Sequence, residues 1–295
     1  MRKLTRRKLR WLIRERGEYP YPKKPGASPK PITDEERECV MRARARHPAS
    51  GAFTLEKAIE GEEGLHIPHN RIHRILKENG LAKDEPRKQR RRKWVRYERK
   101  HSNSLWHADW VEIGGAYVIL IEDDASRLLV GAGSYKNATA QNSLRALKKA
   151  VAAYGKPRQL MTDHGIQFTS LPRESCPEPG LNEFQKWLEE SGIEHVKARV
   201  KHPQSNGKVE KAAGTMMKLI RHFGGLERAV SYYNYRRPHW SLRLEECETP
   251  FQAFIRKMWP AKRRAFIREN IKMIARYAPA YLLEGGFTVE RGSGT

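Results

Sequence analysis

Residues 105–135 read LWHADWVEIGGAYVILIEDDASRLLVGAGSY, and this stretch decides the fold. It holds three apolar segments rich in β-branched and aromatic side chains, Leu105–Ile113, Ala116–Glu122 and Leu128–Tyr135. Short turn sequences, Gly114-Gly115 and Asp123–Arg127, separate these segments. The pattern therefore predicts a three-stranded antiparallel meander.

Helices and strands alternate downstream of the meander. The expected elements are a helix, a strand, a helix, a strand and a long helix, over Thr139–Tyr154, Arg158–Thr162, Leu181–Ser191, Ile193–Ala198 and Gln204–Phe223. A meander followed by such alternation predicts an α/β domain: a mixed five-stranded sheet with flanking helices. This order of elements is typical of the RNase-H-like fold.

Three short helices are expected upstream, over Asp34–Arg46, Phe53–Glu60 and Pro68–Asn79, with breaks at Gly61 and Gly64. The third helix has an apolar stripe on one side and polar, basic residues on the other, namely Asn70, Arg71 and Arg74. An all-α helix-turn-helix module that enters the major groove of DNA fits this pattern. An ordinary three-helix bundle with a solvated basic face is the alternative.

The charge balance indicates a polyanionic partner. The chain has 295 residues, with 58 Lys+Arg against 34 Asp+Glu and a net charge of +24. Residues 1–100 carry a net charge of +15. Within them, Arg87–Lys100 contains nine Lys or Arg in fourteen residues, including Arg90, Arg91, Arg92 and Lys93. We expect this run to contact DNA phosphates, although such a run is also typical of a solvated tether.

Cysteine usage and the apolar runs exclude several classes of protein. Cys39, Cys176 and Cys247 are far apart and form no CxxC pair, so neither a zinc site nor a disulfide framework is expected. Met1–Arg16 is too basic for a signal peptide, and the longest apolar run, Ala116–Ile121, is far shorter than a membrane span. We therefore expect an intracellular protein with no membrane partner.

Three acidic residues stand where a metal site can be built. Asp109 lies among apolar and aromatic neighbours in the first strand, Asp163 follows the fourth strand, and Glu210 lies inside the long helix. Such oxygen ligands suit Mg²⁺ or Mn²⁺, and a pair of ions supports phosphoryl displacement. Each residue alone is also compatible with a turn or a solvated face. Asp123 and Asp124 are expected to cap a turn or pair with Arg127.

Several local sequences resemble the integrase catalytic core of the DDE transposase/integrase superfamily, most closely that of prokaryotic insertion-sequence transposases. They are WHAD at 106–109, DDASR at 123–127, TDHGIQF at 162–168 and HPQSNGKVE at 202–210. YNYRRPH at 233–239 and TPF at 249–251 resemble the C-terminal signature of that group. The resemblance covers about Leu105–Phe254, and Asp34–Lys83 resembles the upstream DNA-binding segment of the same proteins.

The resemblance implies a retroviral-integrase-like, RNase-H-like core that cleaves transposon ends and transfers the 3′-hydroxyl into target DNA. It makes Asp109, Asp163 and Glu210 the catalytic and metal-binding triad, with two Mg²⁺ or Mn²⁺ ions. It also implies double-stranded DNA as the partner, a homo-oligomer of two or more chains, and a cytoplasmic, nucleoid-associated location. Further DNA contacts are expected from Asn206, Lys208, Lys211, Arg236, Arg237 and His239. The alternatives are a cap at the start of a helix for Asn206 and a solvated face for the Lys and Arg residues.

These readings predict six segments along the chain. They are a basic N-terminal segment with a Pro-rich linker (1–31), the helix-turn-helix module (32–83), a basic linker (84–104), the catalytic core (105–225), a C-terminal helical extension (226–258) and a tail without an assigned role (259–295). The 46 residues between Asp163 and Glu210 exceed the spacing in many relatives, and 171–180 is interpreted as an inserted loop.

Two other functions are compatible with this sequence. One is a catalytically inactive or repurposed DNA-binding protein that retains the integrase fold. The other is an RNase-H-type nuclease acting on RNA–DNA hybrids, which the helix-turn-helix module and the basic linker disfavour.

Overall fold

The computed structural model describes residues 10, 11, 14, 15, 31–82, 98–170, 180–198, 207–272 and 274. The chain divides into two compact units, Met1–Arg37 and Glu38–Thr295. In the first unit, the backbone N–H of Thr33 donates to the Glu36 carboxylate at 3.0 Å, and the N–H of Glu36 donates to Thr33 Oγ1 at 3.2 Å. This reciprocal pair caps the start of helix α2 (Asp34–Arg46).

Helices α3 (Ala52–Glu63) and α4 (His69–Glu78) follow in the second unit. The expected break at Gly61 is wrong, because α3 continues through this residue and ends where Gly64 adopts a left-handed φ of 65°. The predicted apolar stripe of α4 is confirmed, since Ile72, Ile75 and Leu76 are buried.

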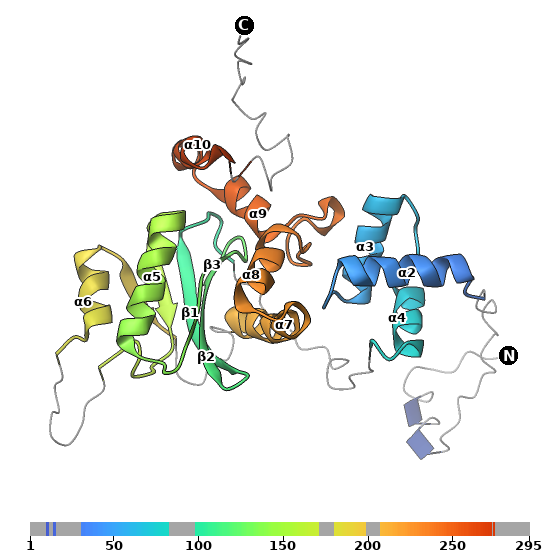
Figure 1. The fold of residues 1–295 in the computed structure, drawn as a ribbon, viewed down its shortest axis with the longest axis horizontal. Coiled ribbons are helices and arrows are strands. Elements are labelled where there is room, and N and C mark those ends of the chain that lie inside the picture. Colours follow the sequence, from blue (N-terminus) through green and yellow to red (C-terminus); the bar gives the residue numbers. More distant parts are fainter. Residues whose placement is uncertain are drawn as a thin grey trace, which may run out of the picture. The chain divides into compact units, whose positions relative to one another are not determined.

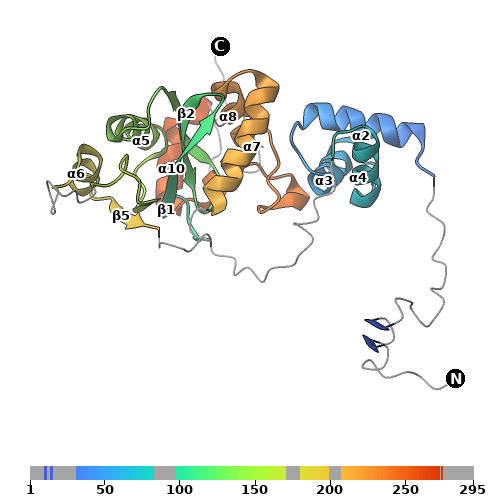
Figure 2. The ribbon, with the colours of Figure 1, turned by 90° about the horizontal axis from the view of Figure 1, so that it is seen from below.

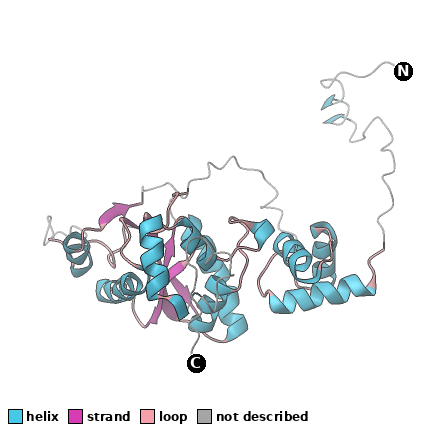
Figure 3. Cartoon of the chain, turned by 90° about the horizontal axis from the view of Figure 1, so that it is seen from above, coloured by secondary structure: helices cyan, strands magenta, loops and turns pink. Residues whose placement is uncertain are grey.

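A five-stranded sheet with the order β3-β2-β1-β4-β5 forms the centre of the second unit (Figures 1 and 3). Strands β1 (Leu105–Ile113), β2 (Ala116–Asp123) and β3 (Leu129–Tyr135) are antiparallel, which confirms the predicted meander. Strands β4 (Gln159–Thr162) and β5 (Glu194–Lys197) continue the sheet parallel to β1. The mixed sheet of the RNase-H-like fold is therefore present.

Helices cover both faces of the sheet (Figures 1 and 2). Helices α5 (Ala140–Tyr154) and α6 (Glu183–Glu190) share one apolar core with the sheet, and α7 (Gly207–Phe223) and α8 (Leu226–Tyr235) share the other. The first core is built around Trp106 and Ile121, and the second around Leu120 and Met216. The sheet is thus buried on two sides, as an α/β sheet requires.

The C-terminal helices belong to the first core. Helix η2 (Leu244–Glu246) leads to α9 (Pro250–Lys257) and α10 (Pro260–Glu269). Phe254 of α9 and Phe266 of α10 are buried together, with ring centroids 5.9 Å apart. Apolar packing therefore extends into the segment for which the sequence indicated no role. No described helix is long and apolar enough to cross a membrane.

Strand β1 sends its side chains alternately to the two cores. Trp106 and Ala108 lie in the core shared with α5. His107 and Asp109 must then face the α7 side, because successive strand residues point to opposite faces. The polar side chains that interrupt the apolar pattern of β1 are therefore directed towards one helix.

Candidate active site

Asp109 lies within β1, and Asp163 directly follows the neighbouring strand β4. Strands β1 and β4 run parallel, with His107 paired to Met161. The ladder between these strands ends at this pair; continued by two residues along both strands, the register sets Asp109 opposite Asp163, which directly follows β4. Adjacent strands are about 4.8 Å apart, so the two carboxylates start from neighbouring backbone positions.

Local backbone groups orient both aspartates. Asp109 Oδ1 accepts a hydrogen bond from the N–H of Trp110 at 2.9 Å, and Asp163 Oδ1 accepts one from the N–H of Gly165 at 3.0 Å. Both carboxylates are half-buried. Glu210 is exposed in the first turn of α7, the helix that covers the same face of the sheet.

Asp109 interacts electrostatically with Asp163 and with Glu210. Burial, and after it the negative charges of Asp163 and Glu210, together raise the pKa of Asp109 to about 6, against the lowering effect of the hydrogen bond from the N–H of Trp110. Mutually repelling carboxylates on strand and helix fit a divalent cation, which relieves that repulsion. However, no group of three or more His, Cys, Asp or Glu within the described residues is close enough to hold a metal ion. Asp163 and Glu210 therefore act electrostatically on Asp109, but among the described residues the three carboxylates are not close enough to ligate one metal ion.

A buried ionic cluster lies beside these carboxylates. Asp124 has no exposed surface and accepts hydrogen bonds from His107 Nε2 at 2.8 Å, from the N–H of Arg99 at 2.6 Å and from Lys208 Nζ. Burial alone would raise the pKa of Asp124, but the hydrogen bond from His107 and the charge of Lys208 outweigh burial and lower this pKa. Lys208 precedes Glu210 by two residues, so the cluster fixes the start of α7.

Two further acids are buried at the end of β2. Asp123 accepts from the N–H and Oγ of Ser126 at 2.9 and 2.6 Å and from the N–H of Asn103 at 2.8 Å, so its predicted role as a turn cap is confirmed. Glu122 is 1% exposed, and burial raises its pKa to about 8. Glu122 Oε2 has no hydrogen-bond partner among the described residues.

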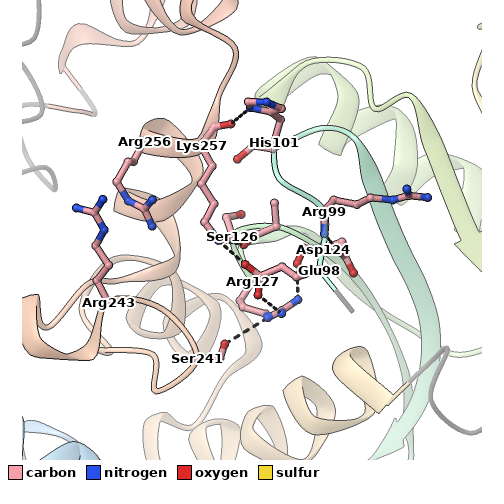
Figure 4. A network of polar contacts seen from close by, with 12 residues as sticks. Glu98, Arg99, His101, Asp124, Ser126, Arg127, Ser241, Arg243, Arg256 and Lys257 are labelled. Carbon is pink, nitrogen blue, oxygen red and sulfur yellow. Dashed lines mark hydrogen bonds and ion pairs between the residues drawn. The ribbon is translucent and has the colours of Figure 1, made fainter. Parts of the chain in front are cut away.

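Arg127 connects this turn to other segments rather than neutralising Asp124. Its guanidinium donates to the carbonyl oxygen of Asp124, to Glu98 at 2.9 Å and to Ser241 at 3.4 Å (Figure 4). Of the two roles expected for Asp123 and Asp124, a turn cap or a pair with Arg127, Asp123 takes the first, and among the described residues the Asp124 side chain pairs with His107 and Lys208. Lys257 of α9 reaches the same place, donating to Glu98 at 2.8 Å and to the carbonyl of Ala125 at 2.6 Å.

The residues expected to contact DNA differ in exposure. Asn70, Arg74, Lys211 and Arg236 are exposed, and Arg71 is half-buried. Arg237 is only 8% exposed and lies 5.8 Å from the ring of Tyr233. Burial lowers the pKa of His239 well below its usual value. Asn206 and Arg90–Lys93 lie outside the described residues.

Sequence reasoning missed the connection between His107, Asp124 and Lys208. A usable signal existed in β1, because His107 and Asp109 are two residues apart and so share a face. The register places Glu122 opposite His107 on that face. A strand pair carrying His, Asp and Glu on one buried face requires nearby cations, and Lys208 supplies one.

Comparison with known proteins gives a family match and sequence relatives. Residues 99–203 match the family described as integrase core domain. The chain is 28% identical over 151 residues to the putative integrase ORF3 of Spiroplasma virus SpV1-C74, a match spanning 46% of this chain and 41% of the relative. It is 27% identical over 206 residues to the insertion element IS407 uncharacterized 31.7 kDa protein of Burkholderia multivorans, spanning 63% of this chain and 69% of the relative.

The matches among solved structures include two viral integrase structures. The HTLV-2 integrase catalytic core domain in complex with magnesium is 19% identical, with a TM-score of 0.42, covering 52% of this chain and 96% of that one. The simian T-cell lymphotropic virus intasome in complex with PP2A regulatory subunit B56 gamma is 19% identical, with a TM-score of 0.46, covering 73% of this chain and 74% of that one.

Proposed function

This chain belongs to the DDE transposase/integrase superfamily, and we propose that it is a DNA transposase that cleaves transposon ends and transfers the freed 3′-hydroxyl into target DNA. Asp109, Asp163 and Glu210 are its proposed catalytic residues. The observation that carries the proposal is the placement of Asp109 within β1, beside the neighbouring strand β4 that Asp163 follows and under the helix that carries Glu210; burial, and then the charges of these two acids, raise the pKa of Asp109. Such perturbed carboxylates are typical of functional sites.

The proposed reaction consists of two displacements at phosphorus. In the first, water attacks the phosphodiester at the element end, the bond to the 3′-oxygen breaks, and a 3′-hydroxyl and a 5′-phosphate result. In the second, that hydroxyl attacks a target phosphodiester and displaces the 3′-oxygen of the target strand. Mg²⁺ or Mn²⁺, with two ions expected, would neutralise charge on the entering and leaving oxygens.

The protein's own contribution is to hold the three carboxylates. The N–H groups of Trp110 and Gly165 fix the rotation of Asp109 and Asp163. The ion pair between Lys208 and Asp124 fixes the start of α7, and with it the backbone that carries Glu210. Positioning of this kind supplies much of the catalysis in phosphoryl transfer.

The proposed partner is double-stranded DNA. The basic balance of the chain and the exposed Asn70 and Arg74 on α4 support this choice. Arg90–Lys93 would add sequence-independent phosphate contacts. Two transposon ends must be joined to one target, so we propose a homo-oligomer of at least two chains acting in the nucleoid of a prokaryotic cytoplasm.

A strand-transfer assay tests the proposal. The substrate is the DNA flanking the gene, incubated with Mg²⁺ or Mn²⁺ and wild-type protein, Glu210→Gln or Glu112→Gln. Glu112, exposed on β1, is the matched control. Joined product from wild type and the control, but not from Glu210→Gln, supports the proposal. DNA binding without product from any protein favours the inactive DNA-binding protein, and preferential cleavage of RNA–DNA hybrids favours the nuclease.

A further inference from the structure

A cationic pocket lies at the opposite ends of the strands from the candidate active site. It has a volume of about 350 Å³. The residues before β1, β4 and β5 and those at the start of α10 line it, the charged and aromatic ones being Lys156, Arg158, Trp259 and Lys262. Asp163 follows β4 while Arg158 precedes it, and five residues of strand span about 16 Å. The pocket is therefore separate from the three carboxylates.

The lining of this pocket is positively charged and contains no acidic residue. Lys156, Arg158 and Lys262 are exposed, and within the described part of the chain none of them forms an ion pair. Lys156 Nζ donates only to the carbonyl of Ser191, at 2.7 Å. Three uncompensated cations around one hollow create a positive potential that attracts an anion.

The pocket also has an aromatic wall. Trp259 is 53% exposed and stacks on His101 with ring centroids 3.8 Å apart. His101 is held by the carbonyl of Lys257, at 3.3 Å (Figure 4). An exposed indole face, supported from behind, offers a stacking surface for a base or a sugar. This combination distinguishes the pocket from a purely basic surface.

Hydrogen bonds hold two of the lining residues, Ser102 and Asn103, in place. Asn103 has a left-handed φ of 62°, and its backbone and side-chain groups bond to Asp123, Tyr154, Trp106 and Arg158. Ser102 donates from its N–H and its Oγ to carbonyls of α9, at 3.1 and 2.9 Å. A site held in this way needs little reorganisation when a ligand binds.

From these features we infer that the pocket binds one nucleotide of a DNA strand, with its phosphate between Arg158, Lys156 and Lys262 and its base or sugar against Trp259. A volume of about 350 Å³ lies at the lower end of small-ligand pockets, which suits one nucleotide better than a larger ligand. The inference relies on the proposed function only for the choice of DNA as the polyanion. Binding of a nucleotide in this pocket requires neither a metal ion nor cleavage or joining of DNA.

The test uses the full chain and measures binding to a 30-base-pair duplex without terminal sequences by fluorescence anisotropy, over a range of salt concentrations. Arg158→Glu/Lys262→Glu is compared with Arg145→Glu/Lys149→Glu, two exposed residues of α5 with the same change in charge. We expect the pocket variant to bind at least about 10-fold more weakly than the α5 variant. Its log–log salt slope should also be smaller by about 1–2, because each lost phosphate contact removes about 0.9.

A crosslink and a competition complete the test. Irradiated 5-iodouracil DNA should crosslink to the peptide containing Trp259 in wild type and not in Trp259→Ala. Equal binding and equal slopes for the two double variants, together with no crosslink at Trp259, would overturn the inference. If no crosslink forms at Trp259, and millimolar pyrophosphate lowers DNA binding by wild type but not by the Arg158→Glu/Lys262→Glu variant, the pocket is a site for a free anion and the inference is overturned. Wild-type protein that crosslinks but yields no joined product would refute the transposase proposal and leave this inference standing.

Discussion

Lys208 on α7 donates a hydrogen bond to Asp124 just past β2, and the Asp124 side chain has no exposed surface while that of Lys208 is 19% exposed. The pair joins the helix that carries Glu210 to the sheet that carries Asp109. The ammonium group of Lys208 neutralises a buried acid, while the predicted DNA contact of this residue stays a prediction. Its position therefore makes it a positioning residue for the proposed site.

Removing Lys208 should destabilise the fold because it leaves Asp124 buried with less compensating charge. For Lys208→Met we expect a loss of about 3 kcal/mol in the free energy of unfolding, the lower end for a broken buried pair, since His107 still donates to Asp124. Urea unfolding measures this loss, with Lys211→Met as the control, because Lys211 is exposed on the same helix. Adding Asp124→Asn should recover part of the loss. A loss no larger than that of Lys211→Met would contradict the assignment.

Glu122 should make stability depend on pH. Burial raises its pKa to about 8, so the folded state holds this proton more tightly than the unfolded chain does. The stability that the proton provides is lost as the pH rises through about 8. Between pH 6.5 and 8 the free energy of unfolding should fall by about 2 kcal/mol, since each pH unit corresponds to about 1.4 kcal/mol. Below pH 6.5, His195 acts in the opposite direction, because burial lowers its pKa to about 4.

Glu122→Gln should remove that pH dependence without changing the shape of the side chain. Thermal unfolding of wild type, Glu122→Gln and the exposed control Glu112→Gln, at pH 6.5 and pH 8, measures the effect. Wild type and Glu112→Gln should both melt at a lower temperature at pH 8. An equally large decrease for Glu122→Gln would show that another group titrates in this range.

Much of the fold was predictable because its signals are local. The alternation in Leu105–Ile113 and the glycine pair after it predicted the first hairpin, and the bounds of β1 agree with that prediction. Gly61 was misread because a glycine inside a helix costs only about 1 kcal/mol, which packing of Leu55 and Ile59 offsets. A local pattern cannot distinguish a tolerated glycine from one that ends a helix.

The candidate site was only partly predictable. The three carboxylates stand out in their local sequences, but the placement of Asp163 beside Asp109 depends on the β1–β4 register, which arises from contacts distant in sequence. The same applies to Lys208 and Asp124, which are separated by 84 residues. The pocket at Trp259 requires α10 to pack against the first core, and α10 lies in a segment for which the sequence indicated no role.

Asn234 should be essential for the edge of the sheet. It is 1% exposed, its Oδ1 accepts from the N–H of Leu129 at 3.0 Å, and its Nδ2 donates to the carbonyl of Leu129 at 2.9 Å. Asn234→Ala leaves both backbone groups buried without partners, and we expect a loss of about 2–4 kcal/mol in unfolding free energy. Asn142→Ala on α5 is the control. Asn234→Asp should also lower the unfolding free energy, because it removes the group that donates to the carbonyl of Leu129. An Asn234→Asp protein as stable as wild type would mean that water donates to this carbonyl instead.

The Arg90–Lys93 cluster, which lies outside the described residues, should bind DNA without sequence preference. Replacing all four residues by alanine should weaken binding equally to two unrelated duplexes. The log–log salt slope should decrease by up to about 4, the value for four lost phosphate contacts. An anisotropy titration at several salt concentrations measures both quantities. An unchanged slope would make this cluster a tether, and unequal weakening would indicate that it reads sequence.

Asp163→Asn should separate binding from chemistry. The substitution keeps an oxygen that can accept the N–H of Gly165, so the loop after β4 should retain its conformation. It removes one of the negative charges that act on Asp109, and with it a proposed metal ligand. We expect strand transfer to fall by at least about 1,000-fold, in line with the loss of a group that organises charge in the transition state, while the DNA dissociation constant changes less than about 3-fold.

The matched control is His164→Asn, an exposed neighbour. An Asp163→Asn protein that joins DNA at the wild-type rate would remove Asp163 from the site, and weakened DNA binding would mean that Asp163 acts through the fold instead.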